Sequence, residues 1–215
     1  MSSAPLRSLG AMSSKVRCQI TMSLDGYVAG PDQTEDEPLG RGGERLHEWF
    51  FGSAGASDVD AEIAAEGLAG TGAYVMGRNM FGPIRGAWGD EDWRGWWGPE
   101  PPYHAPVYVL THHARESVEM EGGTTFHFVT DGLESALAQA RAAAGPDLDV
   151  QVAGGASAVN QALRLGALDE VLLHISPILL GGGERLFVDV GAPRFEIVET
   201  RASRAATHVR YRVVR

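Results

Sequence analysis

The stretch VQVAGGASAVNQAL, which runs from Val150 to Leu163, decides the fold. Its start predicts a buried strand, Gly154-Gly155 predicts a tight turn, and the residues that follow predict an amphipathic helix. Two glycines let the backbone come close to a bulky anion, and the free N–H groups of the next helix face that anion with the positive end of the helix dipole behind them. The stretch therefore indicates a phosphate-binding turn at the edge of an α/β sheet.

A second junction of this kind occurs earlier, in AYVMGRNMF from Ala73 to Phe81. Gly77 and Arg78 lie where a predicted strand becomes a helix. The planar guanidinium of Arg78 suits a phosphate group better than a lysine would, although a surface salt bridge is the simpler alternative. Two such strand ends in one chain indicate a phosphate-rich cofactor that lies across the sheet edge. The fingerprints G-x-G-x-x-G and G-x-x-x-x-G-K-[ST] are absent, which argues against a Rossmann domain or a P-loop.

Short β-branched or alternating runs predict eight strands, and periodic apolar residues predict four helices. The strands are 16–22, 73–76, 107–110, 124–129, 148–153, 170–176, 195–200 and 208–214, and the helices are 44–51, 58–68, 132–144 and 156–165. We expect Asp131 to be the N-cap of the third helix, with Glu134 completing a capping box. The alternation predicts an α/β fold with a mixed, mostly parallel sheet and an antiparallel pair of strands at the C-terminal end.

With 215 residues, the chain is expected to form a single domain over 15–215 after a mobile tail over 1–14. A formal net charge of -10 argues against a nucleic-acid or anionic-membrane partner. Cys18 is the only cysteine and falls in an apolar strand, so a buried, inert thiol is expected, and no metal is implied. No run is long and apolar enough for a membrane span, and the N-terminal residues lack the apolar core of a secretory signal, so a cytoplasmic protein is expected.

A segment rich in Trp, Gly and Pro occupies 82–106 and contains Trp88, Trp93, Trp96 and Trp97. Irregular segments of this length in compact domains are usually functional or disordered, and four tryptophans argue against disorder. The simpler alternative is that they only cover a sheet edge or a subunit contact.

Five motifs, in the same order, resemble dihydrofolate reductase and the reductase domain of the riboflavin-pathway deaminase/reductase. They are ITMSLDGYVAG at 20–30, VMGRNMF at 75–81, VYVLTHH at 107–113, VAGGASAVNQAL at 152–163 and HISPILLGGGERLF at 174–187. The resemblance covers nearly the whole chain from Val16 onward. It implies an eight-stranded mixed sheet flanked by helices, NADPH as cofactor, and a homodimer.

The resemblance also implies where NADPH would bind. Backbone groups of Thr21 and Val28 would meet the nicotinamide, and the remaining contacts would be made to the phosphates. Those phosphate-side residues are Gly77, Arg78, Asn79, Thr111, His112, Gly154, Gly155, Ala156 and Ser157.

On the substrate side, Asp25 is the best-placed carboxylate to donate the proton that must accompany a hydride, because burial would raise its pKa. Its position before Gly26 is equally typical of a simple turn. Aromatic residues are expected to form a pocket for a flat heterocycle, although each one singly is typical of ordinary core. These residues are Tyr27, Trp49, Phe50, Phe81 and Trp88.

The substrate half departs from both relatives at three positions. Leu46 stands where dihydrofolate reductases carry an acidic residue, and Tyr27 and Ala153 stand where the riboflavin-type reductases usually have Lys and Glu. We therefore expect an NADPH-dependent reductase of a pterin-like or aminopyrimidine-like heterocycle. The alternatives are a reductase of a quinone, a flavin or a small carbonyl compound, and a non-catalytic protein that binds a nucleotide or a drug.

Overall fold

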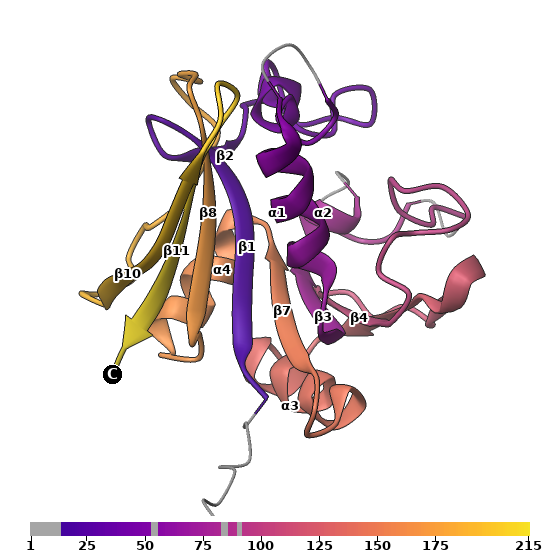
Figure 1. Cartoon of the computed structure of the whole chain (residues 1–215). Coiled ribbons are helices and arrows are strands. Elements are labelled where there is room, and N and C mark those ends of the chain that lie inside the picture. Colours follow the sequence, from indigo (N-terminus) through magenta and orange to yellow (C-terminus); the bar gives the residue numbers. More distant parts are fainter. Residues whose placement is uncertain (1–13, 53–55, 83–85, 90–91) are drawn as a thin grey trace, which may run out of the picture.

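The computed structural model describes residues 14–52, 56–82, 86–89 and 92–215, so most of the tail expected over 1–14 lies outside the described residues. These residues form a nine-stranded sheet in the order β10-β11-β8-β1-β7-β3-β4-β6-β5, and β2 and β9 form a separate antiparallel pair. Figure 1 shows the part of this sheet from β10 to β4. The strands are β1 Val16–Ser23, β2 Tyr27–Ala29, β3 Thr71–Gly77, β4 Pro106–Leu110, β5 Val118–Glu119, β6 Thr125–Val129, β7 Asp149–Gly154, β8 Glu170–Ser176, β9 Glu184–Arg185, β10 Arg194–Ala202 and β11 Thr207–Val214.

The predicted fold class is confirmed. Strands β8, β1, β7, β3, β4 and β6 pair in parallel, while β11 is antiparallel to β8 and β10 is antiparallel to β11. The sheet has one strand more than predicted, because β5 has only two residues and such a short pairing leaves no periodic pattern in the sequence. The parallel strands all end at the same edge of the sheet, which is the edge where both glycine junctions lie.

Helices cover both faces of the sheet. Helices α3 (Leu133–Ala144) and α4 (Ala156–Arg164) pack against one face, and α1 (Asp58–Leu68) lies across the other, in front of the sheet in Figure 1. The described residues also form a short helix α2 (Arg78–Phe81) and two 3-10 helices, η1 (Gly43–His47) and η2 (Glu121–Gly123).

Two local predictions about helices are wrong. Gly132, and not Asp131, is the N-cap of α3, and no side chain caps this end of the helix. The helix predicted over 44–51 is only the single 3-10 segment η1, because positive φ angles at Gly42 and Gly52 bound the segment and confine it. The residues around Trp49 therefore form a loop that packs on the sheet, and not an α-helix.

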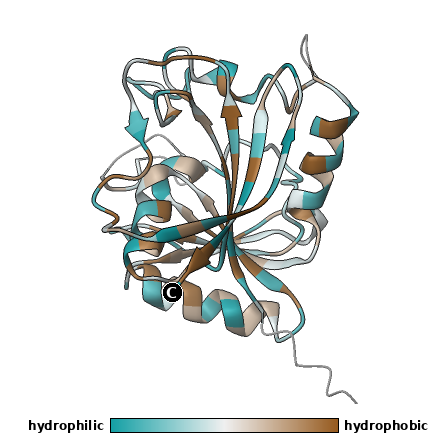
Figure 2. Ribbon diagram, turned by 60° about the vertical axis from the view of Figure 1, so that its left-hand side comes forward, coloured by the Kyte–Doolittle hydropathy of each residue, from teal (hydrophilic) through white to brown (hydrophobic). Residues whose placement is uncertain are grey.

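Two apolar cores stabilise the sheet. The larger core lies between the sheet and helices α3 and α4, and it includes Val16, Cys18, Val150 and Val152. Figure 2 shows hydrophobic and hydrophilic residues alternating along helices and strands, as expected for elements with one face toward a core. Cys18 is 1% exposed, and burial raises the pKa of its thiol to about 12, so the expected inert thiol is confirmed.

The second core explains the Trp-rich segment. Tyr74, Met76, Val107 and Phe126 form the sheet side of this core, and the side chains of Trp88, Trp93 and Trp97 pack against it. The tryptophans therefore cover the sheet face over β3, β4 and β6. Residues 83–85 and 90–91 of the same segment lie outside the described residues.

Among the described residues, no helix is both long and apolar enough to cross a membrane.

Phe126 is the centre of the second core, since its ring contacts those of Phe81, Trp97 and Tyr103 and is fully buried. We expect Phe126→Ala to lower the free energy of unfolding by about 3–5 kcal/mol through lost burial and a cavity. Urea unfolding followed by far-UV circular dichroism measures this value. In the matched control Phe51→Ala, whose ring is 74% exposed, the loss should stay within about 0.5 kcal/mol. Equal losses in the two variants would contradict this assignment of the core.

Candidate functional site

The two glycine junctions meet at the carboxyl edge of the sheet. Strand β3 ends at Gly77 and its neighbour β7 ends at Gly154, and Met76 is the register partner of Gly154. A Cβ atom at Gly77 would lie 3.6 Å from the backbone nitrogen of Gly155 and 3.9 Å from the Cβ of Ala158. The peptide bond between Gly154 and Gly155 is cis. Turns that are 77 residues apart in the sequence therefore form one surface.

The N-terminus of α4 faces open space at this surface. Gly155 is the N-cap, and the first intrahelical hydrogen bond is donated by the Val159 N–H to the Gly155 carbonyl, 3.2 Å away. The N–H groups of the first turn, which include those of Ala156 and Ser157, thus have no acceptor within the helix. Nothing lies within 4 Å of a Cβ built on Gly155, and Gly154 has φ +135°, which side chains rarely adopt. Free donors, open space and a helix dipole together favour an anionic ligand.

Arg78 supplies the positive charge of this edge. Its Nη1 donates hydrogen bonds to the Gly86 carbonyl (3.1 Å) and to Thr111 Oγ1 (3.2 Å), and its guanidinium carbon lies 3.2 Å from the ring centroid of Trp88. Its Nε and Nη2 are buried and find no acceptor among the described residues. Burial, and then the positive charge of Arg115, lower the pKa of Arg78. Buried donors without acceptors beside a second arginine fit a phosphate group.

The other residues predicted on the phosphate side lie around Arg78. Thr111 is buried, and its hydroxyl oxygen also accepts a hydrogen bond from the His113 N–H at 3.1 Å. His112 is exposed, and Asn79 is half-buried in the first turn of α2. Arg115 was not anticipated, because it lies in an irregular segment with no motif around it. Its guanidinium carbon lies 4.8 Å from the ring centroid of Trp88, so the Trp88 ring contacts the guanidinium groups of both Arg78 and Arg115.

Strand β1 separates from β7 before the sheet edge is reached. The last paired residue of β1 on this side is Cys18, whereas β7 continues to Gly154. The Lys15 carbonyl faces β7, because it accepts a hydrogen bond from the Val150 N–H. Since backbone groups alternate in direction along a strand, the N–H and carbonyl of Thr21 also face that side, beyond the last pair. They are therefore placed to bind a ligand. Val28 lies in β2, which pairs with β9, and its side chain is buried.

The carboxyl of Asp25 does not have the raised pKa expected from the sequence. Its carboxylate accepts hydrogen bonds from Ser23 Oγ (2.6 Å) and from the backbone N–H groups of Leu180 (3.1 Å) and Gly181 (2.7 Å). The hydrogen bond from Ser23 is the main reason why the pKa of Asp25 is lowered, and not raised. Asp25 thus remains ionised near neutral pH and joins the loop after β1 to the loop after β8.

An open groove of about 480 Å³ lies beside this loop. Its polar side chains include Asp25, Tyr27 and Arg185, and its apolar side chains include Met22 and Phe187. The guanidinium carbon of Arg185 lies 5.4 Å from the centroid of the Tyr27 ring. Arg185 belongs to the motif quoted at 174–187 but was not predicted as a site residue, because only the pairing of β2 with β9 brings it to Tyr27.

The five aromatic residues expected in one pocket are divided among three places, which corrects that prediction. Phe81 is fully buried in the second core and contacts Trp88 there, with 5.9 Å between ring centroids. Trp49 is 4% exposed and packs on the sheet, while the neighbouring ring of Phe50 is 50% exposed. Tyr27 alone lines the groove. Phe81 is core because α2 is only one turn long and directs this ring inward.

Comparison with known proteins agrees with this architecture. The family model for the RibD C-terminal domain matches residues 14–209. The chain belongs to the RibD C-terminal domain family. The resemblance inferred from the five motifs is thus confirmed.

Solved structures share the RibD-type fold. A protein from Shewanella sp. PV-4, provisionally named a riboflavin biosynthesis protein, has a TM-score of 0.64 at 23% identity, covering 94% of this chain and 99% of its own. A pyrimidine reductase-like protein from Corynebacterium diphtheriae has a TM-score of 0.56 at 15% identity, covering 94% and 92%. A diaminohydroxyphosphoribosylaminopyrimidine deaminase/5-amino-6-(5-phosphoribosylamino)uracil reductase from Thermotoga maritima has a TM-score of 0.55 at 17% identity, covering 94% and 57%.

A curated relative matches over a shorter stretch. Uncharacterized protein YyaP from Bacillus subtilis (strain 168) is 44% identical over 45 residues, which is 21% of this chain and 24% of that protein.

The ionised state of Asp25 gives a test by pH. Because the folded pKa of Asp25 is lower than its unfolded value of about 3.9, its contacts stabilise the fold above that pH and are lost as the pH falls. We expect Asp25→Asn to be less stable than the wild type at pH 7, and the difference to shrink toward pH 3. Urea unfolding at both pH values measures it. A difference that grows on acidification would contradict the lowered pKa.

Proposed function

We propose that this RibD-family protein is an NADPH-dependent reductase that transfers a hydride to a planar heterocycle of the aminopyrimidine or pterin class. The observation that carries the proposal is the meeting of Gly77, Gly155 and the free N-terminus of α4 beside Arg78. One dinucleotide can use all of these groups at once. A substrate without phosphates would leave the buried donors of Arg78 unsatisfied.

The residues present fit NADPH. The N–H groups at the start of α4 would bind the pyrophosphate, and Gly155 leaves the space for it. The guanidinium of Arg78, supported by Thr111, would bind the extra ribose phosphate through its free Nε and Nη2. The backbone groups of Thr21 would bind the nicotinamide carboxamide at the point where β1 leaves β7.

When bound, NADPH supplies the hydride, and the chain's own residues orient the reactants. The unpaired backbone of β1 would hold the nicotinamide end and so orient the hydride donor toward the acceptor. Asp25 holds the loops after β1 and β8 together, and its carboxylate is ionised. In this proposal water, and not the ionised Asp25, would deliver the proton that the reduced heterocycle takes up.

The groove beside the loop after β1 supports a heterocyclic substrate. Tyr27 offers a flat ring for stacking, and Arg185 offers a charge for an anionic substituent. Relatives of the same fold are named as reductases of a phosphoribosylaminouracil or as pyrimidine reductase-like. We take the class of substrate from those names. Because Tyr27 stands where the riboflavin-type reductases usually have lysine, we expect this position to bind the heterocyclic ring of the substrate by stacking.

Arg78→Ala should weaken NADPH binding much more than NADH binding. Loss of charged hydrogen bonds worth about 1.5–3 kcal/mol corresponds to a Kd for NADPH that rises about 10- to 100-fold, whereas the Kd for NADH should change less than about 3-fold. Titration by nicotinamide fluorescence measures both constants. Retained NADH binding shows that the variant is folded.

The control is Arg194→Ala, which removes an exposed arginine at the start of β10. Arg194→Ala should leave both dissociation constants unchanged, which excludes an effect of net charge alone. Equal losses of NADPH and NADH affinity in Arg78→Ala would remove Arg78 from the ribose-phosphate site.

Turnover separates the candidate activities. We expect oxidation of NADPH, followed at 340 nm, with an aminopyrimidine or pterin acceptor. Faster oxidation with quinones, flavins or small carbonyls would replace the proposed substrate class. NADPH binding without turnover across the whole panel would indicate a binding protein and not an enzyme.

A further inference from the structure

A row of buried polar side chains crosses three strands on the sheet face that α1 and η1 cover. Thr21 of β1 is the register partner of His174 of β8, and His174 is the partner of His208 of β11. The three residues are 5%, 1% and 2% exposed. Apolar residues are usual at such positions, so each polar group in the row needs a partner.

Hydrogen bonds join the two histidines into a chain between a carboxylate and an amide. His208 Nε2 lies 2.9 Å from Asp60 Oδ1, His208 Nδ1 lies 2.7 Å from His174 Nδ1, and His174 Nε2 lies 3.0 Å from Gln19 Nε2. All four imidazole nitrogens are therefore engaged. We call Asp60, His208, His174 and Gln19 the relay.

The partners fix the positions of the protons. Burial tends to raise the pKa of Asp60, but hydrogen bonds from His208, Ser57 and Ser203 outweigh it and keep the carboxylate ionised. His208 therefore donates from Nε2 and, when neutral, accepts at Nδ1, so His174 must donate from Nδ1 and accept at Nε2 from the Gln19 amide.

In this arrangement the two rings have opposite tautomers. Burial and the nearby positive groups lower the pKa of His174 to about 3. The charged or titratable groups that act on His174 are His208, His47, Arg210 and Asp60, and burial lowers the pKa of His47 to about 4. A second proton on the His174 ring would sit on Nε2 and would oppose the amide donor of Gln19.

Trp49 lies over the row and connects it to Thr21. The indole ring is 4.3 Å from the His174 ring, tilted by 37°, and meets the His208 ring edge-on at 5.0 Å. Its Nε1–H donates a hydrogen bond to Thr21 Oγ1, 3.2 Å away. The indole of Trp49 therefore contacts both imidazole rings and the Thr21 hydroxyl at the same time.

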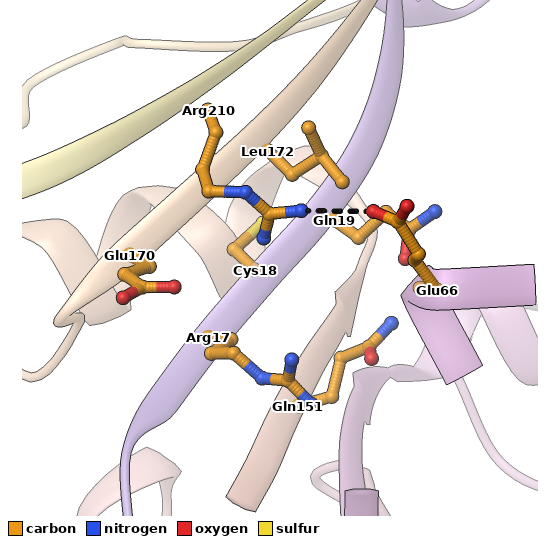
Figure 3. Close-up of a pocket in the computed structure, with 9 residues that line it drawn as sticks. Arg17, Cys18, Gln19, Glu66, Gln151, Glu170, Leu172 and Arg210 are labelled. Atoms are coloured by element: carbon orange, nitrogen blue, oxygen red, sulfur yellow. Dashed lines mark hydrogen bonds and ion pairs between the residues drawn. The ribbon is translucent and has the colours of Figure 1, made fainter. Parts of the chain in front are cut away.

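The relay ends beside a small cavity of about 20 Å³, enough for about one water molecule. Figure 3 shows Gln19 in its wall, with Arg210 and Glu66 joined across it. Helix α1 presses on Gln19 here, because a Cβ at Gly67 would overlap the Gln19 carboxamide. Gln19 is thus held in the orientation that donates to His174.

We propose that Asp60, His208 and His174 are positioning residues, which fix the Trp49 indole against Thr21 and so set the end of β1 that faces the nicotinamide. The inference rests on the proposed function, since Thr21 is assigned there to the cofactor. None of the relay residues lines the groove beside Tyr27, and none of them is assigned to the cofactor. Their effect on the reaction runs through Trp49.

Asp60→Asn tests the relay with little change of shape, because an amide can present its donor to His208 and reverse both tautomers. In the wild type, long-range ¹H–¹⁵N spectra at pH 7 should show His174 protonated at Nδ1 and His208 at Nε2. In Asp60→Asn these assignments should change, and the Trp49 indole N–H resonance should shift. The control Asp58→Asn, which changes an exposed carboxylate in the same helical turn, should move neither signal.

Kinetics then separate positioning from stability. The relay lies on β1, β8, β11 and α1, whereas the proposed phosphate contacts lie on α2 and α4, so the Kd for NADPH should stay within about 3-fold while kcat falls about 10-fold or more. Trp49→Phe, which removes the donor to Thr21, should lower kcat to a similar extent. The double variant with Asp60→Asn should lose little more, because both changes break one connection.

Each outcome decides the inference. Multiplying losses in the double variant, an unmoved indole resonance, or wild-type tautomers opposite to those expected would overturn it. If Asp60→Asn does not fold, the wild-type tautomers and the split between kcat and Kd in Trp49→Phe decide. If the wild-type protein does not bind NADPH, the proposed function is wrong. The shift of the indole resonance in Asp60→Asn then still tests whether the relay positions Trp49.

Discussion

The arrangement of this molecule depends on two parallel strands that end side by side on glycine. Because Met76 is paired with Gly154, the first turn of α2 and the first turn of α4 start from neighbouring points. A Cβ at Gly154 would lie 3.3 Å from the sulfur of Met80, and its φ angle excludes most side chains. Backbone approach, free N–H groups and the charge of Arg78 are brought together by that constraint, and not by any single motif.

The two faces of the sheet have different chemistry, which follows from the alternation of residues along β1. Cys18 and its neighbours of the same parity face α3 and α4 in an apolar core, whereas Gln19 and Thr21 face α1 and η1 among histidines and carboxylates. The apolar face supplies most of the burial that stabilises the sheet. The polar face has fixed hydrogen-bond directions, so it can specify orientation at the edge where β1 leaves β7.

The sequence was sufficient for the sheet and the glycine junctions, because buried parallel strands and strand–glycine–helix turns leave local patterns. It failed where long-range contacts decide. The sequence around Asp25 predicts an acid in a pocket, but in the structure the N–H groups of Leu180 and Gly181 donate hydrogen bonds to its carboxylate. Phe81 was predicted to line a pocket, but it lies in the second core. The pairing of His174 with His208 depends on the register of antiparallel strands, which no local pattern encodes.

The position of Cys18 makes the alkylation rate of this thiol a measure of how often the centre of the sheet opens. It is paired with β7 on one side and β8 on the other, and thiol reagents attack only the thiolate. The rate of alkylation in the native protein therefore reports how often β1 separates from β7 and β8. A ligand that binds across the ends of β3 and β7 would lower the alkylation rate of Cys18 by mass action, whether or not the ligand reacts.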